Sequence, residues 1–73
     1  MDKQELKTKI GQRVKQLRNE KEISQIELAS ACNFEKSNLS RLEAGNTSPN
    51  IYTLYKIAQN LDVELSELFK FKN

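Results

Sequence analysis

The sequence predicts an all-α fold, a compact domain of five short helices. Apolar residues recur at helical spacing along most of the chain, and residues that favour helix ends stand before and after these repeats. No segment has a convincing strand pattern, although LFKFK alternates and could extend. The 73 residues, 37% hydrophobic and 30% charged, are enough for one folded domain and too few for two. We therefore expect residues 1–73 to form a single domain.

The first helix is predicted by a stripe of apolar residues spaced three or four apart: Leu6, Ile10, Val14 and Leu17. Asp2, followed three residues later by Glu5, provides a capping box at its start, and the stripe ends near residues 19–22. Gly11 lies inside the stripe, where glycine costs about 1 kcal/mol relative to alanine. Either another backbone passes close to Gly11 or it is a tolerated surface glycine, and both interpretations are open.

The remaining helices follow from their end signals. Ser24 and Glu27 form a second capping box at the start of a helix from about residue 25 to 32, and Asn33 suits the left-handed conformation that ends one. A third helix runs from about residue 35 to 43, before Gly45. Asn50 caps a fourth, whose repeat comprises Ile51, Leu54, Ile57, Ala58 and Leu61. After Asp62, a brief fifth helix is indicated by Leu65, Leu68 and Phe69.

The third helix has an unusually wide polar face. Leu39 and Leu42 share one side of a helical wheel, Asn38 and Glu43 lie on the flanks, and the opposite side collects four hydrogen-bond donors: Lys36, Ser37, Ser40 and Arg41. Two short helices joined by a tight turn fit the helix-turn-helix geometry, in which the second helix enters the major groove of DNA. The alternative is an ordinary solvated face, which would be favoured for an isolated amphipathic helix.

Side chains on this face suit the edges of bases. Guanine O6 and N7 are acceptors that match arginine and lysine, while serine can serve several bases. Lys36, Ser37 and Arg41 are therefore the leading candidates for base contacts. Ser40 is short, so a contact to phosphate or through water is equally open. The net charge is only +2, but residues 1–21 hold seven of the basic residues against three acids, which suits one end of the domain to a polyanion.

The sequence lacks the residues that several other classes of function require. The chain has no histidine and a single cysteine, so it can form neither an internal disulfide nor an ordinary zinc site, and we expect no metal and no cofactor. It has no glycine-rich phosphate loop and no nucleophile with a base beside it, so we do not expect an enzyme. No apolar run approaches the roughly 20 residues of a membrane span, and the N-terminus is charged, so we expect a cytoplasmic protein.

From Ile10 to Phe69 the sequence resembles the Cro/lambda-repressor-type helix-turn-helix family, often called XRE-like. The similarity lies in IGQRVKQLR, ISQIELA, LSRLEAGNTSPN and LYKIAQNLDVELSELF. Its most specific parts are SQxxLA, RLExG, the proline that follows and KIAxxL. The resemblance implies a lambda-repressor-like fold with the motif at about residues 24–43. It also implies a transcriptional regulator, such as a repressor, that binds double-stranded DNA.

The resemblance also implies roles for individual residues. Gln25, at the positive N-terminal end of the second helix, matches a glutamine that binds a DNA phosphate. Arg18 and Glu43 match an ion pair that joins the first helix to the end of the recognition helix. Core positions are matched by Leu28, Ala29, Cys32, Leu39 and Leu42, so we expect Cys32 to be buried rather than a redox sensor. Further phosphate candidates are Ser24, Arg18, Lys15, Arg13 and Asn46.

Three positions depart from the family pattern. Asn33 stands where the family usually has glycine, as does Asp62 before the last helix, which puts the turn at Asp62 in question. Glu35 replaces the usual serine or threonine cap of the third helix. Its carboxylate would meet DNA with the wrong charge, unless it accepts a hydrogen bond from cytosine N4 and so contributes to specificity.

A single short recognition helix makes few base contacts, and a two-fold dimer on half-sites about 34 Å apart overcomes this. We therefore expect a homodimer on a pseudo-palindromic operator, with residues 50–73 serving both the core and the dimer surface. Candidate dimer residues are Tyr52, Leu65, Phe69 and Phe71, and for Leu65 a core role is equally open. The alternative function is a protein-interaction module or an antitoxin on the same helical scaffold.

Overall fold

The computed structural model describes residues 1–71, and residues 72–73, which include the end of LFKFK, lie outside the described part. In chain order the elements are α1 (Lys3–Glu20), α2 (Gln25–Cys32), α3 (Lys36–Glu43), α4 (Ile51–Asn60) and the 3-10 helix η1 (Leu65–Phe69). Residues 1–71 contain no strand. The all-helical class is therefore confirmed, and LFKFK is not extended over residues 68–71.

The last predicted helix is present but is not an α-helix. It is a 3-10 helix, in which the amide of Glu67 donates to the Glu64 carbonyl at 2.9 Å and that of Lys70 to the Glu67 carbonyl at 3.3 Å. The tighter 3-10 pattern pairs more of the amides in so short a segment than an α-helix would. Residues 1–71 thus form four α-helices and one 3-10 helix.

Side-chain caps start three of the helices. Ser24 and Glu27 form the complete capping box of α2, and the Asn50 side chain accepts the Thr53 amide at 2.8 Å to start α4. Asp2 accepts the Glu5 amide at 2.7 Å, but among the hydrogen bonds of residues 1–71 there is no return bond from Glu5. The predicted box at the start of α1 is therefore only half formed.

Residues with a left-handed backbone conformation follow α2, α3 and α4. Asn33 has φ 63° and ψ 37°, as predicted for the residue after α2. Asp62 has φ 57°, a left-handed conformation that favours glycine, so this turn forms without glycine. Gly45, two residues after α3, has φ +79°. These turns reverse the chain sharply and allow four short helices to share one core.

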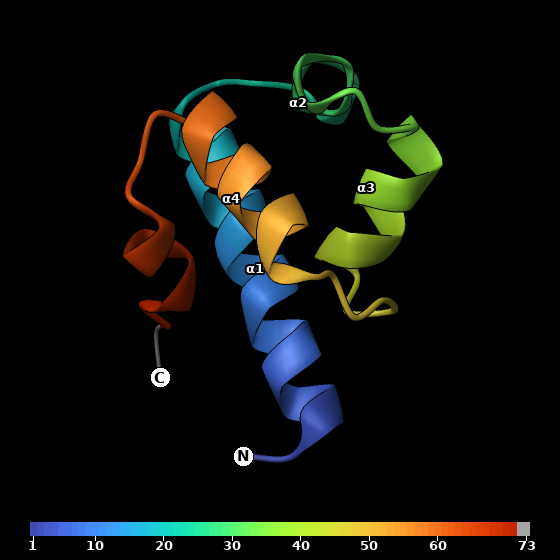
Figure 1. Cartoon of the computed structure of the whole chain (residues 1–73), viewed down its shortest axis with the longest axis vertical. Helices are drawn as coiled ribbons and strands as arrows, with labels where there is room; N and C mark the ends of the chain where they lie inside the picture. Colours follow the sequence, from blue (N-terminus) through green and yellow to red (C-terminus); the bar gives the residue numbers. More distant parts are fainter. Residues whose placement is uncertain (72–73) are drawn as a thin grey trace.

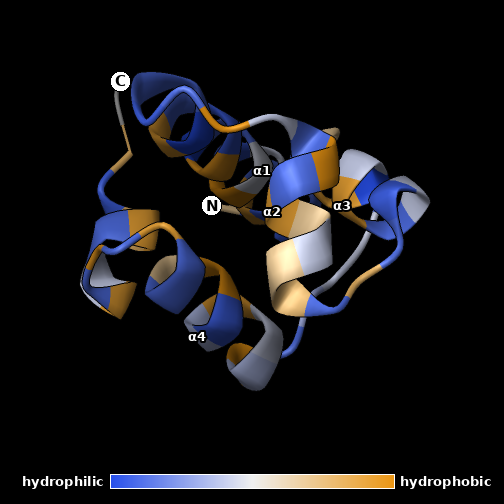
Figure 2. Ribbon diagram, turned by 90° about the horizontal axis from the view of Figure 1, so that it is seen from above, coloured by the Kyte–Doolittle hydropathy of each residue, from blue (hydrophilic) through white to orange (hydrophobic). Residues whose placement is uncertain are grey.

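The core is built from apolar residues of every element. Its buried members are Ile10, Val14, Leu17, Leu28, Ala29, Cys32, Leu39, Leu42, Leu54, Ile57, Ala58, Leu61 and Leu68. Two residues of the predicted stripes are not buried, since Leu6 is 40% exposed and Ile51 is 73% exposed. At about 100° per residue, Ile51 lies at the edge of the buried arc of α4, on the side of Tyr55. Hydrophobic and hydrophilic residues take different sides of the helices in this way (Figure 2).

The helices pack in a fixed arrangement around this core. α3 packs against α1 and α2, α4 packs against α2, and η1 packs against both α1 and α4. As a result α3 and η1 lie on opposite sides of the domain (Figure 1). Among residues 1–71, no helix has the length and apolar character to cross a membrane.

Candidate nucleic-acid interface

The outward side of α3 is polar and open to solvent. Lys36, Ser37 and Arg41 are exposed and Ser40 is half-buried, while Leu39 and Leu42 hold the opposite side in the core. Within residues 1–71, neither Lys36 nor Ser37 has a hydrogen bond or ion pair from its side chain. The structure thus brings the four predicted base readers together on one solvent-facing side of α3.

Glu35 directly precedes this side. It occupies the cap position of α3 and is exposed, but its side chain makes no capping hydrogen bond. The departure from serine or threonine therefore leaves the first amides of α3 without a side-chain cap. The Glu35 carboxylate is therefore accessible from solvent at the N-terminal end of α3.

The inner end of α3 is held by a buried ion pair. Glu43 is 7% exposed and Arg18 8%, and the Arg18 Nε and Nη2 atoms donate to the two carboxylate oxygens at 2.7 and 2.9 Å. Arg18 Nη1 donates to the Ile23 carbonyl at 2.8 Å. The hydrogen bonds to Glu43 raise the pKa of the Arg18 guanidinium, although burial opposes them. The ion pair implied by the resemblance is therefore present, between α1 and the last turn of α3.

Gln25 joins this cluster. Its side-chain Nε2 donates to Glu43 Oε1 at 2.9 Å, so Glu43 orients the residue that begins α2. A primary amide has two N–H donors, which leaves one for another partner. Ser24, beside it, is exposed and accepts the Glu27 amide at 3.0 Å.

Gly11 marks the closest approach of α1 to α3. A Cβ atom at this position would lie 2.4 Å from the Leu42 carbonyl oxygen and 2.7 Å from that of Glu43. Both atoms belong to the backbone and cannot move independently of the helix. Of the two interpretations of Gly11, the structure therefore selects the close approach of another backbone.

A second contact with α1 holds the loop after α3, and the sequence analysis missed it. Gln4 Nε2 donates to the Gly45 carbonyl at 3.0 Å and to Thr8 Oγ1 at 3.2 Å. A Cβ on Gly45 would lie 2.9 Å from the Thr8 Cα. A glutamine among charged residues near the start of a helix carries no pattern that points to a partner 41 residues away.

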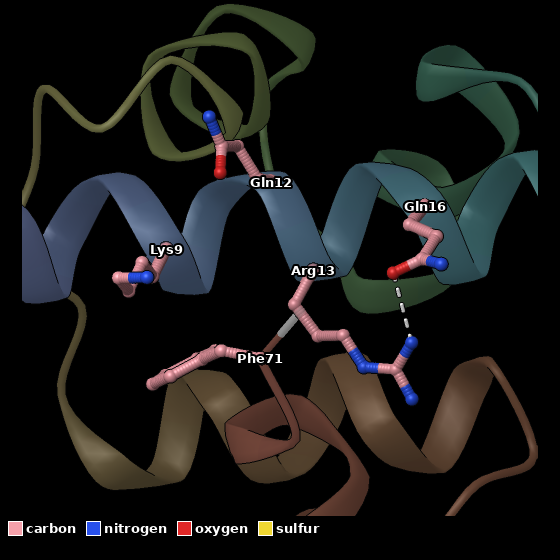
Figure 3. A pocket seen from close by; sticks show the side chains of 5 residues that line it. All are labelled: Lys9, Gln12, Arg13, Gln16 and Phe71. Atoms are coloured by element: carbon pink, nitrogen blue, oxygen red, sulfur yellow. Dashed lines mark hydrogen bonds between the residues drawn. The ribbon is translucent and has the colours of Figure 1, made fainter. Parts of the chain in front are cut away.

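The two arginines of α1, both predicted as phosphate contacts, have partners within the protein. All three side-chain nitrogens of Arg18 donate within the protein. Arg13 donates to the Glu67 carbonyl at 2.7 Å, to the Glu67 carboxylate at 3.1 Å and to Gln16. Figure 3 shows Arg13 extended toward the segment that carries Phe71. At about 100° per residue this side of α1 is roughly opposite Gly11, and hence opposite α3.

The other phosphate candidates lie on the side of α3. Lys15 is exposed and only about 40° around α1 from Gly11. Asn46 is exposed in the loop after α3, one residue beyond the Gly45 contact. Both residues are thus exposed on segments next to α3, as is Ser24 before the start of α2.

The candidate dimer residues fall into two groups. Tyr52 is 66% and Phe69 43% exposed, whereas Leu65 and Phe71 are partly buried against the core. Tyr52 stacks on Tyr55 with ring centroids 6.4 Å apart, and Tyr55 borders an open groove of about 470 Å³ between α4 and η1. The outward side of α4 is thus aromatic where that of α3 is polar.

Known proteins share this architecture. A model of the helix-turn-helix family matches residues 14–68. The transcriptional regulator SinR of Bacillus subtilis is 43% identical over 65 residues, which are 88% of this chain and 59% of SinR. The immunity repressor of Bacillus phage phi105 is 32% identical over 59 residues, or 81% of this chain. The chain spans only 41% of that repressor's length.

A solved structure extends the similarity to three dimensions. The crystal structure of SinR, the master regulator for biofilm formation, in complex with DNA superimposes with a TM-score of 0.77 at 44% identity. The match covers 84% of this chain and 98% of that chain. With the family match, the capping box, the left-handed Asn33 and the Arg18–Glu43 pair, the chain belongs to the XRE-type helix-turn-helix family of non-enzymatic, DNA-binding transcriptional regulators.

Proposed function

We propose that this chain binds a pseudo-palindromic operator in double-stranded DNA as a homodimer, with α3 of each copy in the major groove. The observation that carries the proposal is the contrast across α3. Its outward side presents exposed donors, while its inner side is fixed by Leu39, Leu42 and Glu43. A rigid helix with exposed donors fits the width of the major groove and the acceptors on base edges there.

The proposed base contacts are made by Lys36, Ser37 and Arg41. Arg41 can donate two parallel hydrogen bonds to guanine O6 and N7, and Lys36 acts as a point charge near similar acceptors. Ser40 is half-buried and short, which favours contact to a phosphate or through water. Glu35 is exposed and makes no capping hydrogen bond, so its carboxylate is free to accept a hydrogen bond from cytosine N4.

The proposed phosphate contacts surround α3. Gln25 retains one amide N–H after its bond to Glu43, and it stands with Ser24 at the N-terminal end of α2, where amides and the helix dipole attract anions. Lys15 and Asn46 add contacts from α1 and from the loop. We leave Arg13 and Arg18 out of this set, because their guanidinium groups are engaged within the protein.

The proposed dimer surface lies on the outward side of α4. Tyr52 and Tyr55 are exposed there at 66% and 46%, Ile51 at the edge of the buried arc is 73% exposed, and Phe69 of η1 is 43% exposed. Adjoining large apolar groups are typical of protein interfaces, where aromatic side chains contribute most of the binding energy. Leu65 is partly buried and lines the groove that Tyr55 borders, whereas Phe71, also partly buried, lines a hollow on α1 beside Arg13.

Selection of bound sequences from random DNA duplexes tests the proposal directly. We expect recovery of a pseudo-palindrome whose half-sites are about one helical turn apart, because a two-fold dimer binds in that way. Recovery of a single, non-repeated half-site would overturn the homodimer. Absence of any enriched sequence, together with affinity that does not fall as salt rises, would overturn DNA binding and favour a protein-interaction module on this scaffold.

A further inference from the structure

The buried position of Glu43 changes which residues of α3 face outward. The sequence alone places Glu43 on the flank of the polar face. In the structure Glu43 is buried together with Leu39 and Leu42. At about 100° per residue the three define a buried arc whose centre is opposite Ser37 and Arg41. Asn38 then lies about 90° from that centre and Lys36 about 70°, so Asn38 is turned outward at least as far as Lys36. Asn38 is exposed, in agreement with this geometry.

Asn38 also contacts the central base reader. Its Oδ1 atom accepts a hydrogen bond from Arg41 Nη2, one turn further along α3. This contact restricts a guanidinium group that would otherwise sample many rotamers at the surface. The remaining N–H groups of Arg41 stay available, and so does the amide NH₂ of Asn38. The two side chains together form one row of donors along the outward side.

The occupied Oδ1 atom limits what Asn38 can recognise. A free asparagine reads adenine with two bonds, accepting from N6 and donating to N7. With Oδ1 bonded to Arg41, only the donating half remains. Such a group matches an acceptor, namely guanine O6 or N7, adenine N7 or thymine O4, and disfavours the amino group of cytosine.

We propose that Asn38 is a further specificity-determining residue, which holds Arg41 toward guanine and donates its own amide to an acceptor on the neighbouring base pair. The inference rests on the proposed function, because it requires α3 in the major groove. It assigns Asn38 two roles, positioning of Arg41 through Oδ1 and recognition of a base through the amide NH₂. One substitution removes both roles, and another removes only the second.

The test measures affinities for the selected operator and for duplexes in which each base pair is changed in turn. Asn38→Leu removes both roles, so the preference for guanine opposite Arg41 should fall roughly tenfold and the neighbouring preference should vanish. Asn38→Asp keeps an acceptor for Arg41 but has no amide. It should retain the guanine preference and change the neighbouring preference from acceptor bases to cytosine.

Two controls make the result decisive. Asn60→Leu is the same substitution at another exposed helical asparagine, on α4, and should leave both preferences unchanged. The pair Asn38→Ala and Arg41→Ala should be coupled, so that the double variant loses less guanine preference than the product of the single losses.

Distinct outcomes separate this inference from the proposed function. If the unmodified chain enriches no sequence, the proposed function fails. If it enriches an operator while Asn38→Leu and Asn38→Asp keep both preferences, only the role of Asn38 is overturned. Independent effects of Asn38→Ala and Arg41→Ala would overturn the positioning role.

Discussion

The two sides of α3 differ in what holds their residues. On the inner side, Glu43 accepts hydrogen bonds from Arg18 and Gln25, and Gly11 brings the α1 backbone against the Leu42 and Glu43 carbonyls. On the outer side, exposed donors have few partners within the protein. The difference teaches that one helix can be fixed in place without using the groups that it presents to DNA. Substitutions on the inner side should therefore change stability, and those on the outer side only binding.

The largest effect is expected from Arg18→Ala. Removal of this guanidinium leaves Glu43 as an unpaired buried charge, which costs roughly 3–5 kcal/mol of the free energy of unfolding. Small domains have little more than this in reserve, so chemical denaturation should show a protein close to unfolding. A midpoint equal to that of the unmodified chain would mean that the inner side does not fix α3.

A double substitution sharpens the same point. Arg18→Met with Glu43→Leu replaces the ion pair by apolar groups and should recover most of the stability, because such replacements are often neutral. DNA affinity should stay low, since Gln25 loses the acceptor that orients its amide. Full recovery of DNA binding would show that Glu43 does not position Gln25.

Gly11→Ala should be the next largest effect. The new methyl group would meet two backbone oxygens at 2.4 and 2.7 Å, and overpacking of this kind costs about 1–3 kcal/mol. The gain of about 1 kcal/mol in helix propensity offsets only part of it. Thermal unfolding should show net destabilisation, and the matched change Gln12→Ala, at an exposed site of α1, should be nearly neutral. A stabilised Gly11→Ala would contradict the close approach.

On the outer side, Arg41→Ala should leave the unfolding midpoint unchanged and reduce discrimination at one base pair about tenfold or more. The matched control is Lys15→Ala, which removes a proposed phosphate contact. It should weaken binding to all sequences alike and make the slope of log affinity against log salt shallower by about 0.9. If both variants lost affinity uniformly, Arg41 would be a phosphate contact instead of a base reader.

The outward side of α4 extends the comparison to a protein partner. Tyr52→Ser should raise the dimer dissociation constant at least tenfold, because an exposed aromatic residue at an interface contributes strongly. The monomer should keep its unfolding midpoint, since little of Tyr52 is buried. Sedimentation measures the first quantity and dilute-solution denaturation the second. An unchanged dimer would remove Tyr52 from the interface.

The smallest effect is expected at η1, far from α3. Hydrogen bonding to Lys70, followed by the charges of Lys70 and Arg13, lowers the pKa of Glu67. The ionised Glu67 carboxylate therefore contributes its full share of stability above the ordinary glutamate pKa of about 4.3. This contribution is lost as the pH falls through the lower pKa that Glu67 has in the folded protein. The stability difference between the unmodified chain and Glu67→Gln should shrink in that range. A difference that grows on acidification would contradict the lowered pKa.

Much of the fold could be predicted because its signals are local. Ser24, Asn33 and Asn50 act on amides and turns within a few residues of themselves, so the ends of α2 and the start of α4 were readable. The helix type of the short η1 could not be predicted, because apolar spacing does not distinguish an α-helix from a 3-10 helix over five residues. The face of α3 was predicted in outline, but Glu43, which was placed on its flank, is buried.

The sequence by itself determined the helices, the left-handed turns, most of the buried stripe and the family resemblance, since each depends on residues close together in the chain. The tertiary structure decided that Gly11 admits another backbone, that Glu43 is buried, that Gln4 holds Gly45 and that Arg13 binds Glu67. These contacts join residues 25 to 54 positions apart. Because they exist only after the helices pack, no local pattern specifies them, and they determine which side of α3 is left open to solvent.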